Sequence, residues 1–213
     1  SFSRIQFHSE GRMKILYTPI SRLVHRVQIV ARELGIEEEI EWIPTQPYES
    51  PAHLLKHNPL SRVPTLVTDQ GLALFPGHII YEYLEGIAGP KLYPLELKNR
   101  WKALHLLSLG EGLWDMVVLW NNEQKRPQEN QWMPQIERYT SAVSRILDSL
   151  ELVISEDSIF NIGHISVGGT LSFLDLCNER YREEQNIDSK FFDFRNKRPN
   201  LSDWYVAINK RSS

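Results

Sequence analysis

The sequence predicts an α/β domain built on a small sheet, followed by an all-helical domain. Short apolar runs alternate with amphipathic helical stretches from residue 13 to about residue 89. Glycine and proline then interrupt the pattern at residues 89–94, which is typical of a linker. From Leu95 onward, apolar residues recur only at helical spacing.

The first elements follow from apolar runs and the residues that end them. Residues 14–17 form an apolar strand that ends at Thr18-Pro19. Ser21 stands where a helix N-cap belongs, and the helical spacing after it closes at Gly35. Residues 39–44 alternate like a second strand, and residues 51–58 form a short helix that ends before Pro59.

Two more strands and a helix complete the first domain. Residues 65–68 and 72–75 read as strands joined by a turn at Gly71, and a helix with apolar residues on one face follows Gly77. A helix between two strands indicates a parallel crossover, whereas the short turn indicates an antiparallel hairpin. The prediction is a mixed four-stranded sheet with helices on its faces.

The second domain contains four predicted helices. Asn161 is a candidate N-cap for the third of them, and Pro199 begins the last. The predicted domains are residues 13–89 and 96–213, joined by a linker at 90–95. Residues 1–12 lack a secretory apolar core, so we expect a tag or an extension there. The first three helices span residues 96–122, 132–154 and 164–183.

Composition excludes several classes of protein. Hydrophobic residues make up 41% of the chain and charged residues 24%, which predicts a packed core. The net charge of −3 comes without any block of like charges, so we expect no nucleic-acid partner. Cys177 is the only cysteine, which suits a reducing cytoplasm and predicts no metal site. No apolar run reaches the roughly 20 residues that cross a bilayer, so no membrane partner is expected.

Val63-Pro64 is the most informative step in the chain. Proline has no N–H for a sheet ladder, so it belongs at the first residue or the edge of a strand. An X-Pro bond at such a place can be cis. The exposed backbone of Val63 could then pair with a peptide-like ligand as though it were another strand.

Several motifs, taken in order, carry a resemblance to a known family. The segment from Tyr17 to Val27 is similar to S-P-x-S-P-[FY]-x-R-K-V, and Asn58 to Leu66 resembles N-P-x-x-x-V-P-x-L. Residues 161–165 stand where a T-x-G-D-I capping element is found, and residues 199–204 also match. Together they resemble the glutathione S-transferase family, over nearly everything from Met13 to Ser213, with a serine-type opening.

The resemblance implies a thioredoxin-like domain that binds glutathione, and a helical domain that lines a pocket for an apolar electrophile. It also implies a cytoplasmic homodimer that uses glutathione as co-substrate. Ser21 is then the first catalytic candidate, because a hydroxyl and N–H groups at a helix start can hold a thiolate. Tyr17 is the second, since tyrosine activates the thiol in some branches. An ordinary cap for Ser21 and core packing for Tyr17 remain open.

The expected glutathione contacts lie in two loops. Val63 supplies main-chain groups beside a cis Pro64, with Arg62 next to them. Where the family has an acidic residue and a serine, this chain has Pro76-Gly77, so we expect glutathione to be held more weakly, through the Gly77 N–H. His78 is either a compensating donor or an ordinary solvent-exposed histidine.

Basic residues on the first helix are weaker candidates. Arg22, His25 and Arg26 are placed to meet a carboxylate of glutathione, to form a solvated helix face, or to form the rim of an interface. The acceptor candidates are Leu113, Trp114 and Val117, for which ordinary core packing is the alternative.

Two functions are therefore predicted from different classes. The first is an enzyme that conjugates the glutathione thiolate to a small apolar electrophile. The second is a non-catalytic binding or scaffold protein whose glutathione site is weakened at Pro76-Gly77, because a fold can outlive its chemistry. A carrier of apolar ligands is a third, weaker possibility.

Overall fold

The computed structural model describes residues 12–154, 159–185 and 192–211. The extension expected at residues 1–12 lies almost wholly outside the described residues. The chain divides into two compact units between Leu97 and Lys98, and each unit is described by itself.

The N-terminal unit contains the predicted mixed sheet. Its strand order is β2-β1-β3-β4, with β1 parallel to β2, while β3 is antiparallel to both β1 and β4. The crossover and the hairpin at Gly71 are both confirmed. The elements are β1 (Met13–Tyr17), α1 (Arg22–Leu34), β2 (Ile40–Pro44), α2 (Ala52–Leu55), β3 (Thr65–Val67), β4 (Ala73–Leu74) and α3 (Gly77–Ala88).

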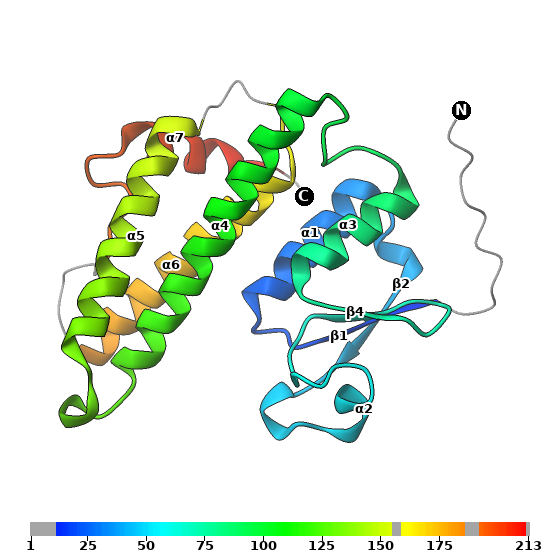
Figure 1. The fold of residues 1–213 in the computed structure, drawn as a ribbon, viewed down its shortest axis with the longest axis horizontal. Helices are drawn as coiled ribbons and strands as arrows, with labels where there is room; N and C mark the ends of the chain where they lie inside the picture. The colour runs from blue at the N-terminus through cyan, green and yellow to red at the C-terminus, as the bar shows by residue number, and fades with distance from the viewer. Residues whose placement is uncertain (1–11, 155–158, 186–191, 212–213) are drawn as a thin grey trace. The chain divides into compact units, whose positions relative to one another are not determined.

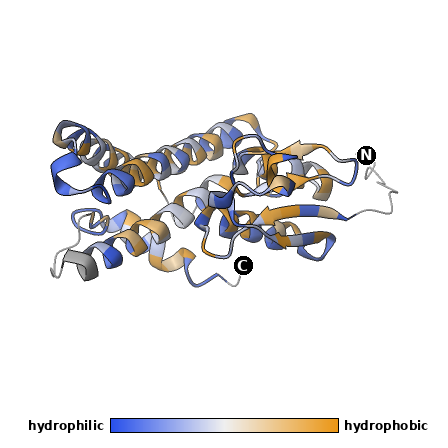
Figure 2. Ribbon diagram, turned by 90° about the horizontal axis from the view of Figure 1, so that it is seen from below, coloured by the Kyte–Doolittle hydropathy of each residue, from blue (hydrophilic) through white to orange (hydrophobic). Residues whose placement is uncertain are grey.

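Helices α1 and α3 pack together on one face of the sheet, and α2 lies on the other side (Figure 1). Strands and helices both carry hydrophobic and hydrophilic residues (Figure 2). Helix α1 buries a stripe at helical spacing, with Val24, Val27 and Val30 wholly inaccessible. Burial of this stripe against α3 and the sheet stabilises the layer.

The ends of α1 are set by two residues identified in the sequence. Ser21 is the N-cap, and its side chain accepts a hydrogen bond from the Val24 N–H. Gly35 ends the helix with φ at 72°, a left-handed conformation that glycine adopts without steric cost.

A buried carboxylate fixes the segment that follows α3. Glu85 accepts hydrogen bonds from three successive backbone N–H groups, those of Lys91, Leu92 and Tyr93, at 2.7 to 3.1 Å. The ammonium group of Lys91 also lies 3.3 Å from the Glu33 carboxylate of α1. The segment predicted to be a linker is therefore tied to two helices of the N-terminal unit.

The second unit is helical, as predicted. Among the described residues of both units, three short 3-10 helices were not predicted: η1 (Glu37–Glu39), η2 (Pro47–Glu49) and η3 (Gln128–Asn130). No helix among the described residues is long and apolar enough to cross a membrane. The main helices of this unit are α4 (Leu97–Gln124), α5 (Met133–Val153), α6 (Ile162–Gln185) and α7 (Pro199–Ile208).

Helices α4 and α6 approach closely at two glycines. A Cβ atom added to Gly163 would lie 2.6 Å from the carbonyl oxygen of Ala103, and one added to Gly110 would lie 2.9 Å from Cβ of Ser166. The Thr170 hydroxyl donates to the Gly110 carbonyl across the same contact, at 2.9 Å. The absence of a side chain at both glycines permits this spacing.

The start of α6 uses a histidine where the resembling motif has aspartate. Nδ1 of His164 accepts a hydrogen bond from the Asn161 N–H at 3.1 Å, and the Asn161 side chain accepts from the Gly163 N–H at 2.9 Å. This reciprocal arrangement is a capping box. Burial, with a further contribution from the charge of Arg211, lowers the pKa of His164 to about 4. The ring is therefore neutral at neutral pH, as an acceptor must be.

Candidate functional site

The loops that carry the predicted site residues leave the same end of the sheet. β1 ends at Tyr17, β3 begins at Thr65 and β4 ends at Leu74, and these strands are neighbours in the order β1-β3-β4. In the antiparallel pair of β1 and β3, Leu16 lies opposite Thr65. This is the last pair of the ladder, so the Val63-Pro64 turn and the turn that leads to Ser21 leave neighbouring strands at the same end of the sheet.

Ser21 caps α1 and still has a proton to donate. Its hydroxyl oxygen accepts from the Val24 N–H over 3.4 Å, which is long for a hydrogen bond. Its own N–H donates to the Thr18 carbonyl at 3.0 Å and closes the turn. Because the hydroxyl acts only as an acceptor toward Val24, its O–H can donate to a ligand. The role of cap and a role toward a thiolate can coexist.

The turn before Ser21 is braced by a histidine. Nε2 of His25 lies 3.2 Å from the carbonyl oxygen of Pro19, and Nδ1 lies 3.2 Å from Nη1 of Arg22. Arg22 is half-buried, whereas Arg26 is wholly buried. A solvated helix face, one of the alternatives for these basic residues, is therefore wrong for Arg26.

Tyr17 packs against a neighbouring strand. Its ring meets Trp42 of β2 edge-to-face, with centroids 5.7 Å apart and an interplanar angle of 84°. The Tyr17 side chain is half-buried. Packing accounts for this position, and its catalytic role stays a prediction that ranks behind Ser21.

The Val63-Pro64 bond is cis, as expected from the sequence. Pro64 is buried and Val63 is half-buried, while the Arg62 side chain is exposed. The cis bond describes the backbone of the turn and does not test ligand binding. The binding roles of these three residues stay predictions.

Asn58 organises this turn, and sequence reasoning missed its role. Its side chain is wholly inaccessible; Nδ2 donates to the Arg62 carbonyl at 3.1 Å and to the Thr65 hydroxyl at 2.8 Å. Its Oδ1 accepts from the Leu60 N–H at 2.9 Å. In the sequence, Asn58 indicated the end of a helix and began the motif that resembles N-P-x-x-x-V-P-x-L, but neither observation predicted these hydrogen bonds. The one available signal was an Asn-Pro step shortly before Val63-Pro64.

Gly77 begins α3 and lies close to the hydroxyl group of Tyr81. A Cβ atom at position 77 would lie 3.0 Å from Oη of Tyr81, so a larger residue would force the ring to move. The preceding Phe75-Pro76 bond is also cis, and Pro76 provides no side-chain cap for the helix. The neighbouring His78 is exposed. The absence of a serine at position 77, which distinguishes this chain from the family pattern, is therefore matched by the packing of Tyr81 against Gly77.

Two of the acceptor candidates lie in the core of the helical unit. Leu113 and Val117 are wholly buried among its apolar side chains. Trp114 is half-buried and packs on Phe173, with ring centroids 4.3 Å apart. Core packing thus accounts for Leu113 and Val117, whereas Trp114 keeps an accessible surface that a ligand can contact.

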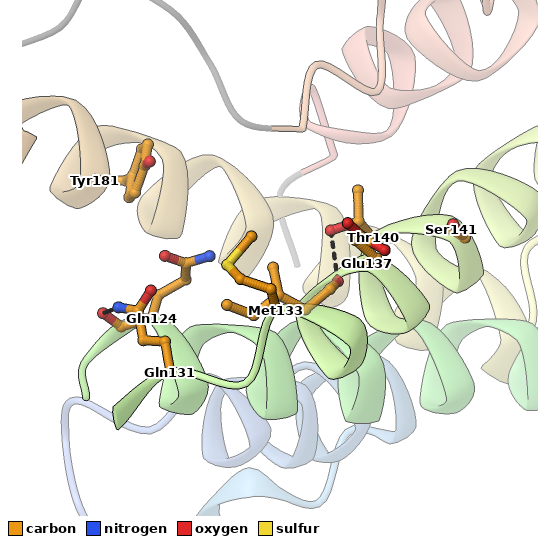
Figure 3. Close-up of a pocket in the computed structure, with 8 residues that line it drawn as sticks. Gln124, Gln131, Met133, Glu137, Thr140, Ser141 and Tyr181 are labelled. Atoms are coloured by element: carbon orange, nitrogen blue, oxygen red, sulfur yellow. Dashed lines mark hydrogen bonds between the residues drawn. The ribbon is translucent and has the colours of Figure 1, made fainter. Parts of the chain in front are cut away.

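A pocket of about 440 Å³ lies elsewhere in the helical unit (Figure 3). None of the three acceptor candidates is among its lining residues. Within the described residues, no group of three or more histidine, cysteine or acidic side chains could hold a metal ion. The pocket is lined by Gln124, Gln131, Met133, Ile136, Glu137, Thr140, Ser141 and Tyr181.

Comparisons with known proteins agree with this architecture. Residues 20–87 match the family model for the N-terminal domain of glutathione S-transferases. An uncharacterised glutathione S-transferase-like protein, YibF of Escherichia coli K12, is 27% identical over 169 residues, which cover 77% of this chain and 83% of YibF.

Two solved structures match over nearly the whole chain. A glutathione transferase family member from Pseudomonas fluorescens Pf-5, with bound glutathione, is 29% identical with a TM-score of 0.81, covering 94% of this chain and 95% of that one. A glutathione S-transferase from Methylobacillus flagellatus KT, also with glutathione bound, is 26% identical with a TM-score of 0.77, covering 94% and 96%. The thioredoxin-like domain and the helical domain are thus confirmed: residues 20–87 match the glutathione S-transferase N-terminal domain, and the chain as a whole shares the fold of glutathione S-transferases.

Proposed function

We propose that this protein binds glutathione at the shared end of β1, β3 and β4 and conjugates its thiolate to a small apolar electrophile. The observation that carries the proposal is that the cis Val63-Pro64 turn and the turn that leads to Ser21 leave the neighbouring strands β3 and β1 at the same end of the sheet. The glutathione-bound relative that is 29% identical over 94% of this chain supports the choice of ligand.

The cysteinyl part of glutathione would pair with the backbone N–H and C=O of Val63, as an added strand would. Its sulfur would then face the Ser21 hydroxyl at the start of α1, where the helix dipole favours an anion. A free thiol has a pKa of about 8.5, so lowering it by roughly two units makes the thiolate dominant at neutral pH. The proton leaves to solvent, and a sulfur lone pair forms the new bond to the electrophilic carbon.

The γ-glutamyl end of glutathione would meet the start of α3. Backbone N–H groups at this helix terminus, with His78 beside them, favour its carboxylate. Pro76 and Gly77 supply no side-chain hydroxyl, and losing one hydrogen bond to a charge costs about 1.5–3 kcal/mol. We therefore expect glutathione to bind roughly ten- to hundredfold more weakly than at a site with that hydroxyl.

The finer parts of the proposal concern partners and location. Trp114 is the proposed contact for the apolar electrophile, since its ring is partly accessible beside Phe173. A homodimer and a cytoplasmic location are proposed from the resemblance to the family.

Calorimetry with glutathione tests the proposal directly. Wild type should bind in the roughly micromolar-to-millimolar range and show the ultraviolet absorbance of a thiolate at neutral pH. Ser21→Ala should still bind but lose that absorbance, whereas Ser21→Thr, which keeps a hydroxyl, should retain much of it. Ser108→Ala, at an exposed serine of α4, is the matched control and should change neither property.

The alternative is a non-catalytic binding or scaffold protein, and the Pro76-Gly77 departure favours it. The absence of detectable heat for wild type at millimolar glutathione would support this alternative. Restoring a serine at position 77 requires room, because its Cβ would crowd Oη of Tyr81. Gly77→Ser should therefore be combined with Tyr81→Phe, with Tyr81→Phe alone as control. Tighter glutathione binding by the double variant would support a weakened but functional site.

A further inference from the structure

His25 makes two contacts at the start of α1 that the proposed mechanism has not used. One ring nitrogen faces the Pro19 carbonyl and the other faces the guanidinium of Arg22, both at 3.2 Å. These contacts form a chain from the turn before Ser21 to the first residue of α1. Its two ends both lie within two residues of the proposed thiol-activating hydroxyl.

The chemistry of the two partners assigns the protonation state of His25. A carbonyl oxygen only accepts hydrogen bonds, so Nε2 must carry the proton that points at Pro19. A guanidinium only donates, so Nδ1 must be unprotonated to accept from Arg22. The two bonds together require neutral imidazole with its proton on Nε2. A protonated His25 would place an N–H group against the guanidinium and break the second bond.

The position of Arg22 is unfavourable unless an anion is nearby. It occupies the first turn of α1, where the positive end of the helix dipole disfavours a cation, and this turn contains no acidic residue. Among the described residues, no carboxylate forms an ion pair with Arg22, and its side-chain partner is the neutral His25. A thiolate at Ser21 would compensate both the guanidinium and the helix dipole.

We propose, building on the proposed function, that His25 is a positioning residue for the thiol: it holds Arg22 at the start of α1, where the guanidinium stabilises the glutathione thiolate. The contact with Pro19 keeps the His25 ring in the orientation that leaves Nδ1 facing Arg22. Bracing of the turn alone is the simpler explanation of the same geometry. The two explanations differ in whether the contact with Arg22 affects the ionisation of the bound thiol.

Two substitutions of His25 separate its contacts. His25→Gln keeps a donor near the position of Nε2 that can reach the Pro19 carbonyl, but it removes the acceptor at the position of Nδ1 that faces Arg22. His25→Asn keeps an acceptor near the position of Nδ1 but removes the donor to Pro19. Arg22→Ala removes the charge and Arg22→Lys restores it. His105→Asn, at an exposed histidine of α4, controls for general effects of losing a histidine.

The measurement is the pH titration of the thiolate absorbance of bound glutathione, with affinity measured by calorimetry. Arg22→Ala and His25→Gln should raise the pKa of the bound thiol by roughly one unit, which is the lower range for one nearby opposite charge. Arg22→Lys should restore most of this difference, and His105→Asn should match wild type. A thermal melt of each variant identifies any that fails to fold, and Arg22→Ala then decides alone.

The outcomes distinguish this inference from the proposed function. If wild type binds no glutathione, or binds it only as the thiol, the proposed function itself fails. If wild type holds the thiolate but Arg22→Ala leaves its titration unchanged, the role of His25 through Arg22 is overturned while the proposed function stands. A change in His25→Gln without one in Arg22→Ala also overturns it, because the effect then runs through the turn.

Discussion

Replacing His164 with asparagine should flatten the dependence of stability on pH. In the folded protein, Nδ1 of His164 accepts a hydrogen bond from the N–H of Asn161, and the ring packs near the rings of Phe160 and Trp204. An asparagine places an acceptor oxygen near the position of Nδ1 but does not titrate. His164→Asn therefore keeps the cap and removes the proton-binding group.

The magnitude follows from the pKa in the two states. Burial first, and the charge of Arg211 second, lower the pKa of His164 to about 4 in the folded protein, against about 6.5 in the unfolded chain. The unfolded state thus binds the proton first as pH falls. The stabilisation is complete above about pH 6.5 and is lost as pH falls to about 4. At about 1.4 kcal/mol per pKa unit, the full loss is about 3 kcal/mol.

Urea unfolding of the full chain at about pH 7 and about pH 4.5 measures this loss. Between these values wild type should lose about 2 kcal/mol more unfolding free energy than His164→Asn does. The smaller asparagine lowers the stability of the variant at every pH, so the comparison is between pH dependences and not between absolute values. His105→Asn, at an exposed site, should keep the pH dependence of wild type.

Parallel losses of stability in wild type and His164→Asn would refute this reasoning. They would mean that the carboxylates of the chain govern its acid sensitivity and that His164 titrates alike in both states. A pH dependence of His105→Asn as flat as that expected of His164→Asn would locate the effect in the simple absence of a histidine.

Three further predictions concern stability and reactivity. Gly163→Ala should lower the free energy of unfolding by about 1–3 kcal/mol or more, because its Cβ would crowd a backbone carbonyl. Gly112→Ala, with open space around it, should raise the free energy of unfolding by about 0.5–1 kcal/mol. Equal urea midpoints for the two variants would contradict the close approach. Asn58→Ala should cost at least about 1–3 kcal/mol, since buried groups of the loop lose their partners, and a variant as stable as wild type would argue against that network. Burial raises the pKa of Cys177 to about 11, so alkylation at neutral pH should be slow until denaturant unfolds the helical unit; rapid labelling of the native protein would show that the thiol is accessible.

Features that depend on neighbours in the chain could be predicted from the sequence. Ser21 and Gly35 were identified as helix ends because capping is a property of a few consecutive residues. The cis Val63-Pro64 step and the hairpin at Gly71 follow from the same kind of local rule. The parallel and antiparallel pairings then followed from the connections between elements, whereas the strand order β2-β1-β3-β4 was not predicted.

Features that depend on packing between distant segments could not be predicted. Nothing in the spacing of α1 indicates that Arg26 is wholly buried while Arg22 is only half-buried. The role of Asn58 depends on hydrogen bonds from its side-chain amide to Arg62 and Thr65, which form only in the folded loop. The crowding of Gly77 by Tyr81 likewise depends on the fold of α3, and it changes how a lost serine can be restored.

The three hydrogen bonds to Glu85 have a practical consequence for dissecting the chain. The end of helix α3 and the glycine-proline break suggest a domain boundary at Gly89. A fragment that stops there would lack Lys91, Leu92 and Tyr93, and with them the three backbone N–H groups that donate to the buried Glu85 carboxylate. The shortest N-terminal fragment worth expressing therefore extends to Leu97. It retains the backbone amides that hydrogen-bond to the buried Glu85 carboxylate in place of water.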